Sequence, residues 1–539
     1  MSRYKAFWQQ VLEYYLEYVQ QFNSITGTAD ERFRNQLWMK QQLAVKQRLD
    51  ALSELHHKLT DEIALQNFSD IDQKLLYDHL QHIHLPVQQA GGFHALVSEV
   101  WRTLGWMEYE IPEPDEDDFS AILAKVSGCA NDMLRSIFQQ LPWSSAIHNL
   151  AGLTKRIAEH IESKLGALES ISYYSHIFYR NQHAYLMAVA HNPKQSSAFI
   201  LPFIQTPHGI TCDAVIMGEQ DMIQVFSFSR SYFQVVCEHP FQLINFLNHW
   251  MPAKSKAQLF INLGYADWGK HLLLRDLLIH RNSTHEMFDF APGIRGLVMI
   301  VFTLPKSNLV LKVIRDTPKP PKENTKEDVI TKYNLVATSD RAGRVADAQR
   351  YARIDLPAEF FSTELLTELL NQAPSSCQRR GDVIILSDIY LERKLIPMNI
   401  YITQQPEIAD KIILDYGRAI EEMASTNLFP GDLLIKNFGI SQEQRVIFYD
   451  YDEVCRVTEC EFLSLPKNWE EEGVVQNMVV YPHQVFPEEF PKFLLPIHQR
   501  KVLVEQFPHL FTPLYWKQLQ QNLGNLFVKD HAPYLPNLP

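Results

Sequence analysis

The sequence lacks several features that mark common classes of protein. Its six cysteines are scattered through 539 residues without a CxxC pair, so neither a disulfide framework nor a zinc site is indicated, and a reducing compartment fits best. Lysine and arginine total 50 against 63 aspartate and glutamate residues, which gives a net charge of −13. The chain therefore lacks the positive field that nonspecific nucleic-acid binding needs.

A long uninterrupted apolar run is also missing near the N-terminus. The opening segment, MSRYKAFWQQVLEYYLEYVQQF, alternates apolar and polar groups at helical spacing, whereas export and membrane spanning require a continuous apolar run. We therefore expect a cytoplasmic protein with no membrane partner. The length of 539 residues, with 46% hydrophobic residues, exceeds what one core usually organises, so roughly two to four domains are expected.

Apolar periodicity predicts a first domain that is mainly helical and contains an inserted sheet. Residues 1 to about 170 repeat apolar groups at near 3.6-residue spacing, which predicts helices. The runs AFILPFI, ITCDAVIM and MIQVFSF, between residues 171 and 236, predict antiparallel strands. Helical spacing returns in FQLINFLNHW and KHLLLRDLLIH and ends near His280. A domain boundary near residue 285 follows.

The sequence after residue 285 predicts a bilobal α+β unit. Four apolar runs and then one helix-period segment occupy residues 297–304, 309–314, 383–391, 395–402 and 407–426. The first two runs flank the turn-forming PKSN and predict a hairpin. Strands first and helices later favour two lobes. We therefore predict a regulatory domain at 1–285 and a second domain at 286–539, with a small lobe at about 286–403 and a large lobe at about 404–539.

The segment FPGDLLIKNFGISQEQRVIFYDYDEV contains the arrangement on which a functional hypothesis depends. Asp432 and Asn437 stand in a DxxxxN relation, which is the spacing of a kinase catalytic loop. In phosphoryl transfer the aspartate accepts or orients the hydroxyl proton, while the asparagine reaches a magnesium ion. Asp450 follows thirteen positions after Asn437, at the end of an apolar strand, and Asp452 alternates with it. Carboxylate oxygens suit Mg²⁺ that bridges ATP phosphates.

Kinase chemistry also requires a phosphate-covering turn and a strand lysine upstream, and both occur in the expected order. Gly293 and Gly296 let backbone amides approach phosphate oxygens, and Arg295 adds positive charge. Lys312, in LVLKVI, is the candidate for pairing with the phosphates. Each feature taken alone also fits an ordinary turn, a solvated strand residue or a helix cap. Their common order and spacing favour the kinase interpretation.

These residues resemble the isocitrate dehydrogenase kinase/phosphatase family of bacteria. The family carries an APGIRG-like ATP loop, a VFKVIKD-like strand, an NxFPGDxLxKNFG loop and a YDYDE segment, which match residues 291–296, 310–316, 427–439 and 449–453. PAKSKAQLFINLGYADWGKHLLLRDLL also resembles a family stretch, so the similarity spans at least residues 252–454.

The resemblance implies one active site that runs kinase, phosphatase and ATP hydrolysis reactions. The implied protein substrate is the active-site serine of isocitrate dehydrogenase, whose phosphorylation diverts isocitrate from the tricarboxylic acid cycle into the glyoxylate bypass. Implied cofactors are ATP and ADP with Mg²⁺, or Mn²⁺ in its place, and AMP as an allosteric effector at a site involving the N-terminal region. A cytoplasmic location is implied, and a homodimer is one alternative for the oligomeric state.

The family pattern also implies roles for individual residues. Asp432 accepts the serine proton, Lys436 lies beside the transferred phosphate, and Asn437 and Asp450 bind the metal ion. The alternation of Asp452 with Asp450 adds Asp452 to the predicted metal ligands. Asp347, in GRVADAQRY, resembles the family's phosphatase aspartate, and we expect it on a helix after the lysine strand. The implied ATP-binding residues are Ala291, Pro292, Gly293, Ile294, Arg295, Gly296, Leu297 and Lys312.

Two departures from ordinary kinases and two rival functions remain. Gly431 replaces the arginine before the catalytic aspartate, and the DYD sequence replaces DFG. Neither Glu323 nor Glu327 is a decisive partner for Lys312. A nucleotide-binding pseudokinase-like scaffold and a small-molecule kinase are the alternative functions. Residues 461–495 have two alternative interpretations, a substrate-docking loop and an irregular surface chain.

The histidines upstream carry no functional assignment. A metal site is disfavoured there because no carboxylate or cysteine pattern completes it; they are His56, His57, His79, His82 and His84.

Overall fold

The structure is a computed structural model that describes most of the chain. The described residues are 2–35, 48, 51, 119–226, 233–293, 295–441, 444–465, 483–494, 497–524, 532 and 534–538. Contacts divide the chain into two compact units, with the division inside one helix. The first unit comprises Met1–Ser227, Ser231–Arg275 and Tyr534–Pro539, and the second comprises Phe228–Arg230 and Asp276–Pro533.

An antiparallel sheet organises the first unit. Within the described residues its strands are β1 (Leu123–Ser127), β2 (Ser170–Tyr174), β3 (Phe178–Arg180), β4 (His183–His191), β5 (Ser196–Thr206), β6 (Gly209–Cys212) and β7 (Ile216–Met217). Their order is β1-β2-β4-β5-β6, with β3 on β4 and β7 on β5. Both faces of the central strand β4 are buried, as its continuous apolar sequence requires. The antiparallel strands predicted at AFILPFI and ITCDAVIM are confirmed.

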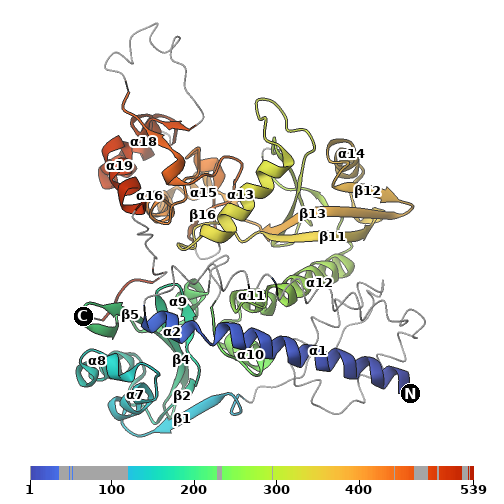
Figure 1. Cartoon of the computed structure of the whole chain (residues 1–539). Coiled ribbons are helices and arrows are strands. Elements are labelled where there is room, and N and C mark those ends of the chain that lie inside the picture. The colour runs from blue at the N-terminus through green and yellow to red at the C-terminus, as the bar shows by residue number, and fades with distance from the viewer. Residues whose placement is uncertain are drawn as a thin grey trace. The chain divides into compact units, whose positions relative to one another are not determined.

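Helices cover this sheet and surround it. They are α1 (Ser2–Thr26), α2 (Ala29–Arg34), α7 (Ala130–Gln139), α8 (Leu150–Leu165), α9 (Glu219–Val225), α10 (Pro240–Trp250), α11 (Lys256–Asn262) and α12 (Ala266–Thr284). Helices α7 and α8 lie side by side (Figure 1) and bury Leu134, Ile137 and Ile157 against the strands. The helices predicted at FQLINFLNHW and KHLLLRDLLIH are confirmed as α10 and part of α12. The second of them continues to Thr284, beyond the predicted end near His280.

The strand predicted at MIQVFSF is wrong, because α9 occupies its first half. Glu219 and Asp221 lie in the first turn of this helix, where carboxylates interact favourably with the helix dipole. Met222, Ile223 and Val225 are buried on its inner side. A short apolar run does not distinguish a buried helix from a strand, so the acidic residues before it were the overlooked signal.

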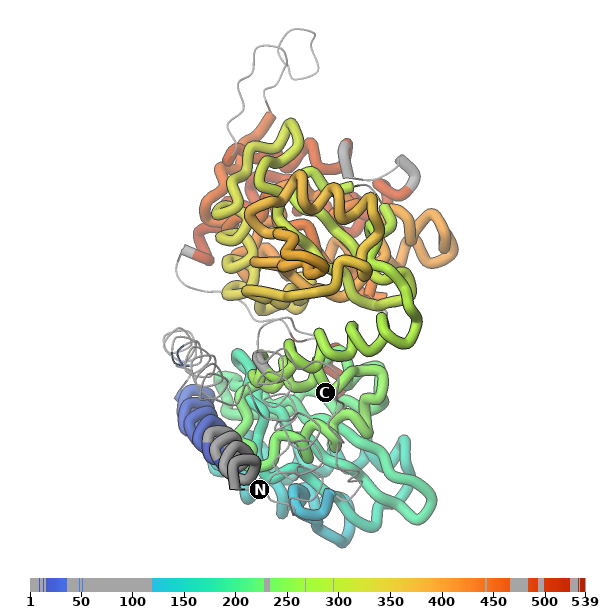
Figure 2. Tube along the Cα trace, turned by 90° about the vertical axis from the view of Figure 1, so that its right-hand side faces the viewer, coloured from blue at the N-terminus to red at the C-terminus, as the bar shows by residue number. Residues whose placement is uncertain are grey.

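The last described residues belong to the first unit, although the sequence prediction counts them with the second domain. The Asn537 side chain accepts a 2.8 Å hydrogen bond from the Val215 backbone N–H and donates one of 2.9 Å to the Val215 carbonyl. The Tyr534 hydroxyl donates to Asp213 at 3.0 Å. Both views place this segment on the first unit (Figures 1 and 2).

A second antiparallel sheet opens the second unit. Its strands are β8 (Asp289–Phe290), β9 (Met299–Thr303), β10 (Leu309–Ile314), β11 (Gln349–Pro357), β12 (Cys377–Arg380) and β13 (Val383–Arg393), in the order β11-β13-β10-β9-β8 with β12 on β13. The predicted hairpin is confirmed as β9 and β10. Helix α13 (Lys326–Ser339) begins at a capping box formed by Thr325 and Asp328, and α14 (Thr363–Gln372) begins at the Ser362 cap.

Helices dominate the rest of the second unit. They are α15 (Met398–Gln404), α16 (Ala409–Ser425), α17 (Phe490–Leu494), α18 (Ile497–Gln506) and α19 (Pro513–Gly524); the strands are β14 (Ile396–Pro397), β15 (Phe438–Ile440), β16 (Val446–Phe448), β17 (Glu461–Phe462) and β18 (Gln484–Val485). Short 3-10 helices occur throughout the chain: η1 (Ser144–Ala146), η2 (Ala358–Phe360), η3 (Pro406–Ile408), η4 (Ile435–Asn437), η5 (Val457–Glu459), η7 (Pro487–Glu489) and η8 (Pro508–Phe511). Helix α16 confirms the predicted helix-period segment.

The strand predicted at 395–402 is mostly wrong. Only Ile396 and Pro397 pair with β15, and α15 begins immediately afterwards. Pro397 has no N–H to continue a ladder, and its φ of −53° is already suited to the start of a helix.

Helix α16 packs closely against the residue that follows α18. Gly417 of α16 faces the Phe507 ring, which a Cβ would approach to 2.4 Å, so glycine permits this contact at the end of α18. Among the described residues, no helix combines the length and apolar character needed to cross a bilayer.

Candidate active site

The turn before Asp432 is packed against the segment that follows the DYD sequence. Phe429 exchanges two backbone hydrogen bonds of 2.9 Å with Cys455. Gly431 has a φ of +85°, and a Cβ at this position would lie 2.5 Å from the Glu453 Cβ. Only glycine tolerates this left-handed and closely packed turn. The structure therefore gives a steric reason for the missing arginine before Asp432.

Asp432 and Asn437 lie together, as their spacing predicted. The Asn437 Nδ2 donates to Asp432 Oδ1, and the Leu434 backbone N–H donates to the same oxygen at 3.1 Å. Burial raises the pKa of Asp432, and the negative charges of Glu453 and Asp450 raise it further. A carboxylate with a raised pKa accepts a proton more readily, provided that it is ionised at the working pH.

Strand pairing brings Asn437 close to the segment that carries Asp450. Strands β15 and β16 are antiparallel with Phe438 opposite Phe448, and the Tyr449 backbone N–H donates to the Asn437 carbonyl at 3.1 Å. Asp450 is the next residue along the chain. The thirteen-residue separation seen in the sequence is therefore closed by one short hairpin.

Asp452 is the second carboxylate of this segment. Burial and then the charge of Asp450 raise the pKa of Asp452 to about 7, against a lowering by the cations of Lys322 and Lys312. Buried carboxylates that repel each other are stabilised by a divalent cation, which provides the positive charge that they lack. The sequence predicts that the two aspartates lie on the end of a strand. Strand β16 ends at Phe448, so both aspartates lie beyond it.

Lys312 is buried on β10, and its carboxylate partner is Glu392. The Lys312 Nζ lies 2.7 Å from Glu392 Oε2, with side-chain exposures of 8% and 1%. The same nitrogen donates to the Tyr449 carbonyl at 3.1 Å. The Tyr333 hydroxyl of α13 donates to the other oxygen of Glu392 at 3.3 Å. Lys312 is therefore positioned by the sheet and directed toward the segment that carries Asp450.

Sequence reasoning missed Glu392. Its two acidic candidates, Glu323 before α13 and Glu327 in the first turn of α13, are both exposed. In the sheet, Lys312 pairs with Tyr390 and Val310 with Glu392, so Glu392 is a diagonal neighbour of the lysine on an adjacent strand. The one signal in the sequence is an acidic residue at the end of the apolar run VIILSDIYLER.

Asp347 lies close to the same segment, but it is not on a helix. Helix α13 ends at Ser339, and Asp347 is in the extended connection that leads into β11. Its neighbour Ala346 receives a hydrogen bond from the Tyr451 hydroxyl, and the Ala346 N–H donates to the Phe448 carbonyl at 2.8 Å. The expected helix is therefore wrong, although Asp347 is adjacent in sequence to a residue that contacts the DYD segment.

A buried arginine anchors this connection to α16. Arg344 donates to both oxygens of Asp415 at 2.8 Å and to Glu422 at 2.6 Å. Asp415 also accepts from the Val446 backbone N–H of β16 at 2.7 Å. Burial alone would raise the pKa of Asp415, but the hydrogen bonds and charge of Arg344, the Val446 N–H and the charge of Arg445 together lower it below its ordinary value. No sequence motif indicated this network.

Lys436 lies in η4, one residue before Asn437. Its carbonyl accepts a hydrogen bond from the Tyr449 hydroxyl, and its ammonium charge lowers the pKa of Asp432. The ammonium charge of Lys436 changes this pKa less than burial does, so the pKa of Asp432 remains above its ordinary value.

The glycine-containing loop joins β8 to β9. Gly293 has a φ of +119°, and a Cβ on Gly296 would lie 2.7 Å from the Met299 carbonyl oxygen. Both positions therefore need glycine. Ala291 is half-buried and Pro292 and Leu297 are exposed, while Ile294 lies outside the described residues. The loop precedes the strand of Lys312, as predicted.

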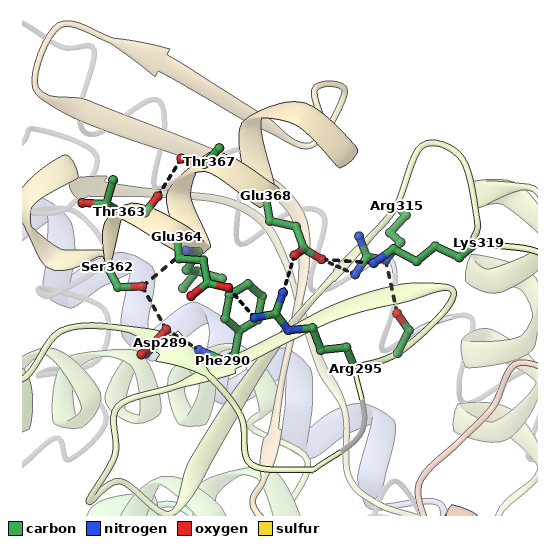
Figure 3. A network of polar contacts seen from close by, with 12 residues as sticks. Asp289, Phe290, Arg295, Arg315, Lys319, Ser362, Thr363, Glu364, Thr367 and Glu368 are labelled. Atoms are coloured by element: carbon green, nitrogen blue, oxygen red, sulfur yellow. Dashed lines mark hydrogen bonds and ion pairs between the residues drawn. The ribbon is translucent and has the colours of Figure 1, made fainter.

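Arg295 is held by carboxylates of α14 (Figure 3). Its guanidinium contacts Glu364 at 2.5 Å and Glu368 at 3.1 Å and stacks over the Phe290 ring at 3.8 Å. Glu368 also contacts Arg315 at 2.5 Å. Residues along α14, together with Lys319, line an open cleft of about 630 Å³. The positive charge of Arg295 is therefore largely neutralised within the protein.

The oxygen donors near Asn437 fit a magnesium nucleotide. Mg²⁺ prefers one or two carboxylates supplemented by phosphate oxygens and water, and the asparagine amide with the two aspartates supplies that kind of donor set. Within the described residues, no group of three or more histidine, cysteine, aspartate or glutamate side chains by itself makes a metal site.

Several predicted features lie outside the described residues. They are the upstream histidines and most of the proposed docking segment, at 466–482.

Phosphoryl-transfer enzymes use a set of residues of this kind. The set comprises an aspartate that can act as a base, an asparagine, a pair of aspartates and a lysine on a strand. The comparisons with known proteins agree with that class. The family model described as "Isocitrate dehydrogenase kinase/phosphatase (AceK) kinase domain" matches residues 286–536, and the corresponding regulatory-domain model matches residues 106–285. The chain belongs to the isocitrate dehydrogenase kinase/phosphatase family, which confirms the resemblance seen in its motifs.

Three curated relatives carry the name isocitrate dehydrogenase kinase/phosphatase. The protein of Methylibium petroleiphilum is 37% identical over 69% of this chain and 62% of its own length. That of Colwellia psychrerythraea is 40% identical over 66% and 63%, and that of an Anaeromyxobacter species is 33% identical over 95% and 93%. The chain thus spans less than two thirds of the length of the first two relatives and nearly all of the third.

Proposed function

We propose that this chain is an ATP-dependent protein serine kinase that also dephosphorylates its product, with isocitrate dehydrogenase as the protein substrate. The observation that carries the proposal is the link from Asp432 through Asn437 to Tyr449, and from Tyr449 to Lys312, in a member of this family. These contacts gather the predicted kinase residues from segments more than a hundred positions apart. The activity switches isocitrate between the tricarboxylic acid cycle and the glyoxylate bypass.

In the kinase direction, Asp432 orients the substrate serine and accepts its proton as the serine oxygen bonds to the γ-phosphorus. The bond between that phosphorus and the β-phosphate bridging oxygen breaks, and ADP is the leaving group. Asn437, Asp450 and Asp452 hold Mg²⁺ or Mn²⁺, which when bound neutralises phosphate charge. Lys312 stabilises the phosphates, while Lys436 lies beside the transferred group.

In the phosphatase direction, Asp347 positions the water that attacks the phosphoserine. Its place beside Ala346, whose carbonyl accepts the Tyr451 hydroxyl, supports a position near the same phosphate. ATP hydrolysis by water at the γ-phosphate uses the same groups. The phosphate that is added carries about two negative charges, which repel a tricarboxylate from the dehydrogenase active site.

We propose a bilobal arrangement of the second domain, with ATP between a small lobe at 286–403 and a large lobe that begins at residue 404 and ends before the Tyr534–Pro539 segment of the first unit. The strand order β11-β13-β10-β9-β8, with the glycine loop between β8 and β9 and Lys312 on β10, supports the small lobe. The glycine loop, from Ala291 to Leu297, then covers the phosphates. Residues 1–285 form the regulatory domain, where AMP acts as an effector in a cytoplasmic enzyme, either monomeric or homodimeric.

The test is incubation of the purified chain with isocitrate dehydrogenase and Mg-ATP, followed by mass spectrometry of the dehydrogenase serine and then addition of ADP. Asp432→Ala should abolish phosphorylation with ATP affinity nearly unchanged, because the carboxylate faces the alcohol. Asp347→Ala should weaken dephosphorylation selectively. Asp382→Ala, on an exposed turn, is the matched control. Full phosphorylation by Asp432→Ala, or an unchanged phosphatase rate in Asp347→Ala, would contradict the assignment.

A further inference from the structure

Two cysteine thiols lie next to each other in the segment that pairs with the chain just before Asp432. The Sγ atoms of Cys455 and Cys460 are 3.5 Å apart, and the Cys460 thiol also lies 3.5 Å from the Arg456 carbonyl. Cys455 is half-buried and Cys460 is buried. A disulfide bond is about 2 Å long, so a movement of roughly 1.5 Å joins the two sulfurs. The other four cysteines have no cysteine partner among the described residues.

The segment that connects these cysteines is bound to the chain just before Asp432. Cys455 exchanges both backbone hydrogen bonds with Phe429. Three residues further on, the Thr458 N–H donates to the Asn427 side chain at 3.1 Å, and Asn427 donates back to the Thr458 hydroxyl at 3.3 Å. A displacement of this segment is therefore transmitted directly to the turn that positions Asp432.

Contacts on the other side limit how the segment can move. Gln520 of α19 donates to the Val457 carbonyl at 2.8 Å and to the Cys460 carbonyl at 2.6 Å. These bonds fix the Cys460 end, so closure of the sulfurs displaces the Cys455 end and the Phe429 backbone that is hydrogen-bonded to it. The hydrogen bond from Cys460 lowers the pKa of Cys455, which favours the thiolate on the more accessible sulfur.

We propose that Cys455 and Cys460 form a redox modification site, in which a hydroperoxide converts the two thiols into a disulfide that slows phosphoryl transfer. The Cys455 thiolate attacks one peroxide oxygen, the O–O bond breaks, and a sulfenic acid and hydroxide form. The Cys460 sulfur then attacks the Cys455 sulfur, the S–O bond breaks, and water leaves. With hydrogen peroxide, two thiols lose two electrons and two protons, and two waters form. A thiol reductant reverses the modification.

The experiment treats the full chain with graded hydrogen peroxide, alkylates the remaining thiols and identifies linked peptides by mass spectrometry. We expect a Cys455–Cys460 crosslink, a several-fold loss of the kinase rate, and recovery of that rate with dithiothreitol. Cys455→Ser and Cys460→Ser should resist this loss, and Cys129→Ser, which removes an exposed thiol, should behave like the parent chain. Because Cys460 is buried, Cys455→Ser is the decisive variant if Cys460→Ser folds poorly.

Three outcomes would overturn the inference: oxidation of Cys129 without the crosslink, equal inactivation of Cys455→Ser, or a complete crosslink with an unchanged kinase rate. The rate readout rests on the proposed function, whereas the peptide readout does not. If the reduced chain transfers no phosphate to the dehydrogenase, the proposed function fails, and the crosslink still decides whether the thiols form the site.

Discussion

The second unit contains two kinds of ion pair, and their burial separates them. Lys312 and Glu392 have side-chain exposures of 8% and 1%, whereas Arg295 and Glu364 have exposures of 47% and 70%. A buried charge that loses its partner retains its desolvation cost, which is typically 3–5 kcal/mol. An exposed pair is screened by water and salt and contributes about 0–1 kcal/mol. Similar N···O distances therefore describe very different energies.

The same contrast separates two ways of positioning a phosphate-binding group. Lys312 is held by a carboxylate from a strand of its own sheet, so its position does not depend on the placement of a helix. Arg295 is held by carboxylates of α14, which water and phosphate can replace. We infer that the lysine is preorganised, while the arginine in the glycine loop can exchange partners.

The largest effect is expected from breaking the buried pair at the site. Glu392→Gln keeps the shape and the contact with Tyr333, but it leaves Lys312 without its carboxylate. Removing one preorganised electrostatic group typically lowers kcat by about 10²–10³-fold, and we expect a loss in the lower part of that range in single-turnover phosphorylation assays. Glu327→Gln, which changes an exposed glutamate of α13, is the control. Equal activity of Glu392→Gln and the parent chain would contradict the claim that the buried pair positions Lys312 for catalysis.

The next largest effect concerns stability. Arg344→Met removes the cation that pairs with Asp415 and Glu422, and it leaves these partly buried carboxylates with only the more distant charge of Arg445. We expect the free energy of unfolding of the second unit to fall by about 3–5 kcal/mol, measured by denaturant titration. Arg353→Met, which breaks an exposed pair with Asp355, should change it by less than about 1 kcal/mol. Similar losses in the two variants would contradict the role assigned to burial.

A pH titration sharpens this result. The folded state lowers the pKa of Asp415, so its stabilisation is present above the unfolded value of about 4 and is lost as pH falls through the lower, folded value. The stability advantage of the parent chain over Asp415→Asn should therefore shrink as the pH is lowered below about 4. Denaturant midpoints measured in an acidic pH series check this. A constant difference would show that the charge of Asp415 is not responsible.

The smallest effect is expected at the exposed pair. Glu364→Gln should change the free energy of unfolding by less than about 1 kcal/mol, because Arg295 keeps Glu368 and the Phe290 ring. Any difference should disappear in 1 M salt, where the screening length is about 3 Å. Thermal unfolding at low and high salt provides the measurement. A large loss of stability that does not depend on salt would show that this exposed pair contributes as much as a buried one.

Much of the site was predictable because its chemistry is concentrated in a few short segments. Asp432, Asn437 and Asp450 follow a spacing that phosphoryl transfer constrains, and the structure links their segments. Glu392 was not predictable in that way, because its partner is set by the lateral register of β10 and β13. Arg344 was missed for a related reason, since it pairs with Asp415 and Glu422 more than seventy positions away.

The sequence by itself determined the helices with strong 3.6-residue periodicity, the hairpin around PKSN, the order of the motifs and the family. These features depend on local pattern and on residue types that chemistry restricts. Only the tertiary structure decided that MIQVFSF begins in a helix, that Asp347 lies in an extended connection, and that Lys312 pairs with Glu392. Burial and strand register settle such questions, and both arise from contacts between residues that are distant along the chain.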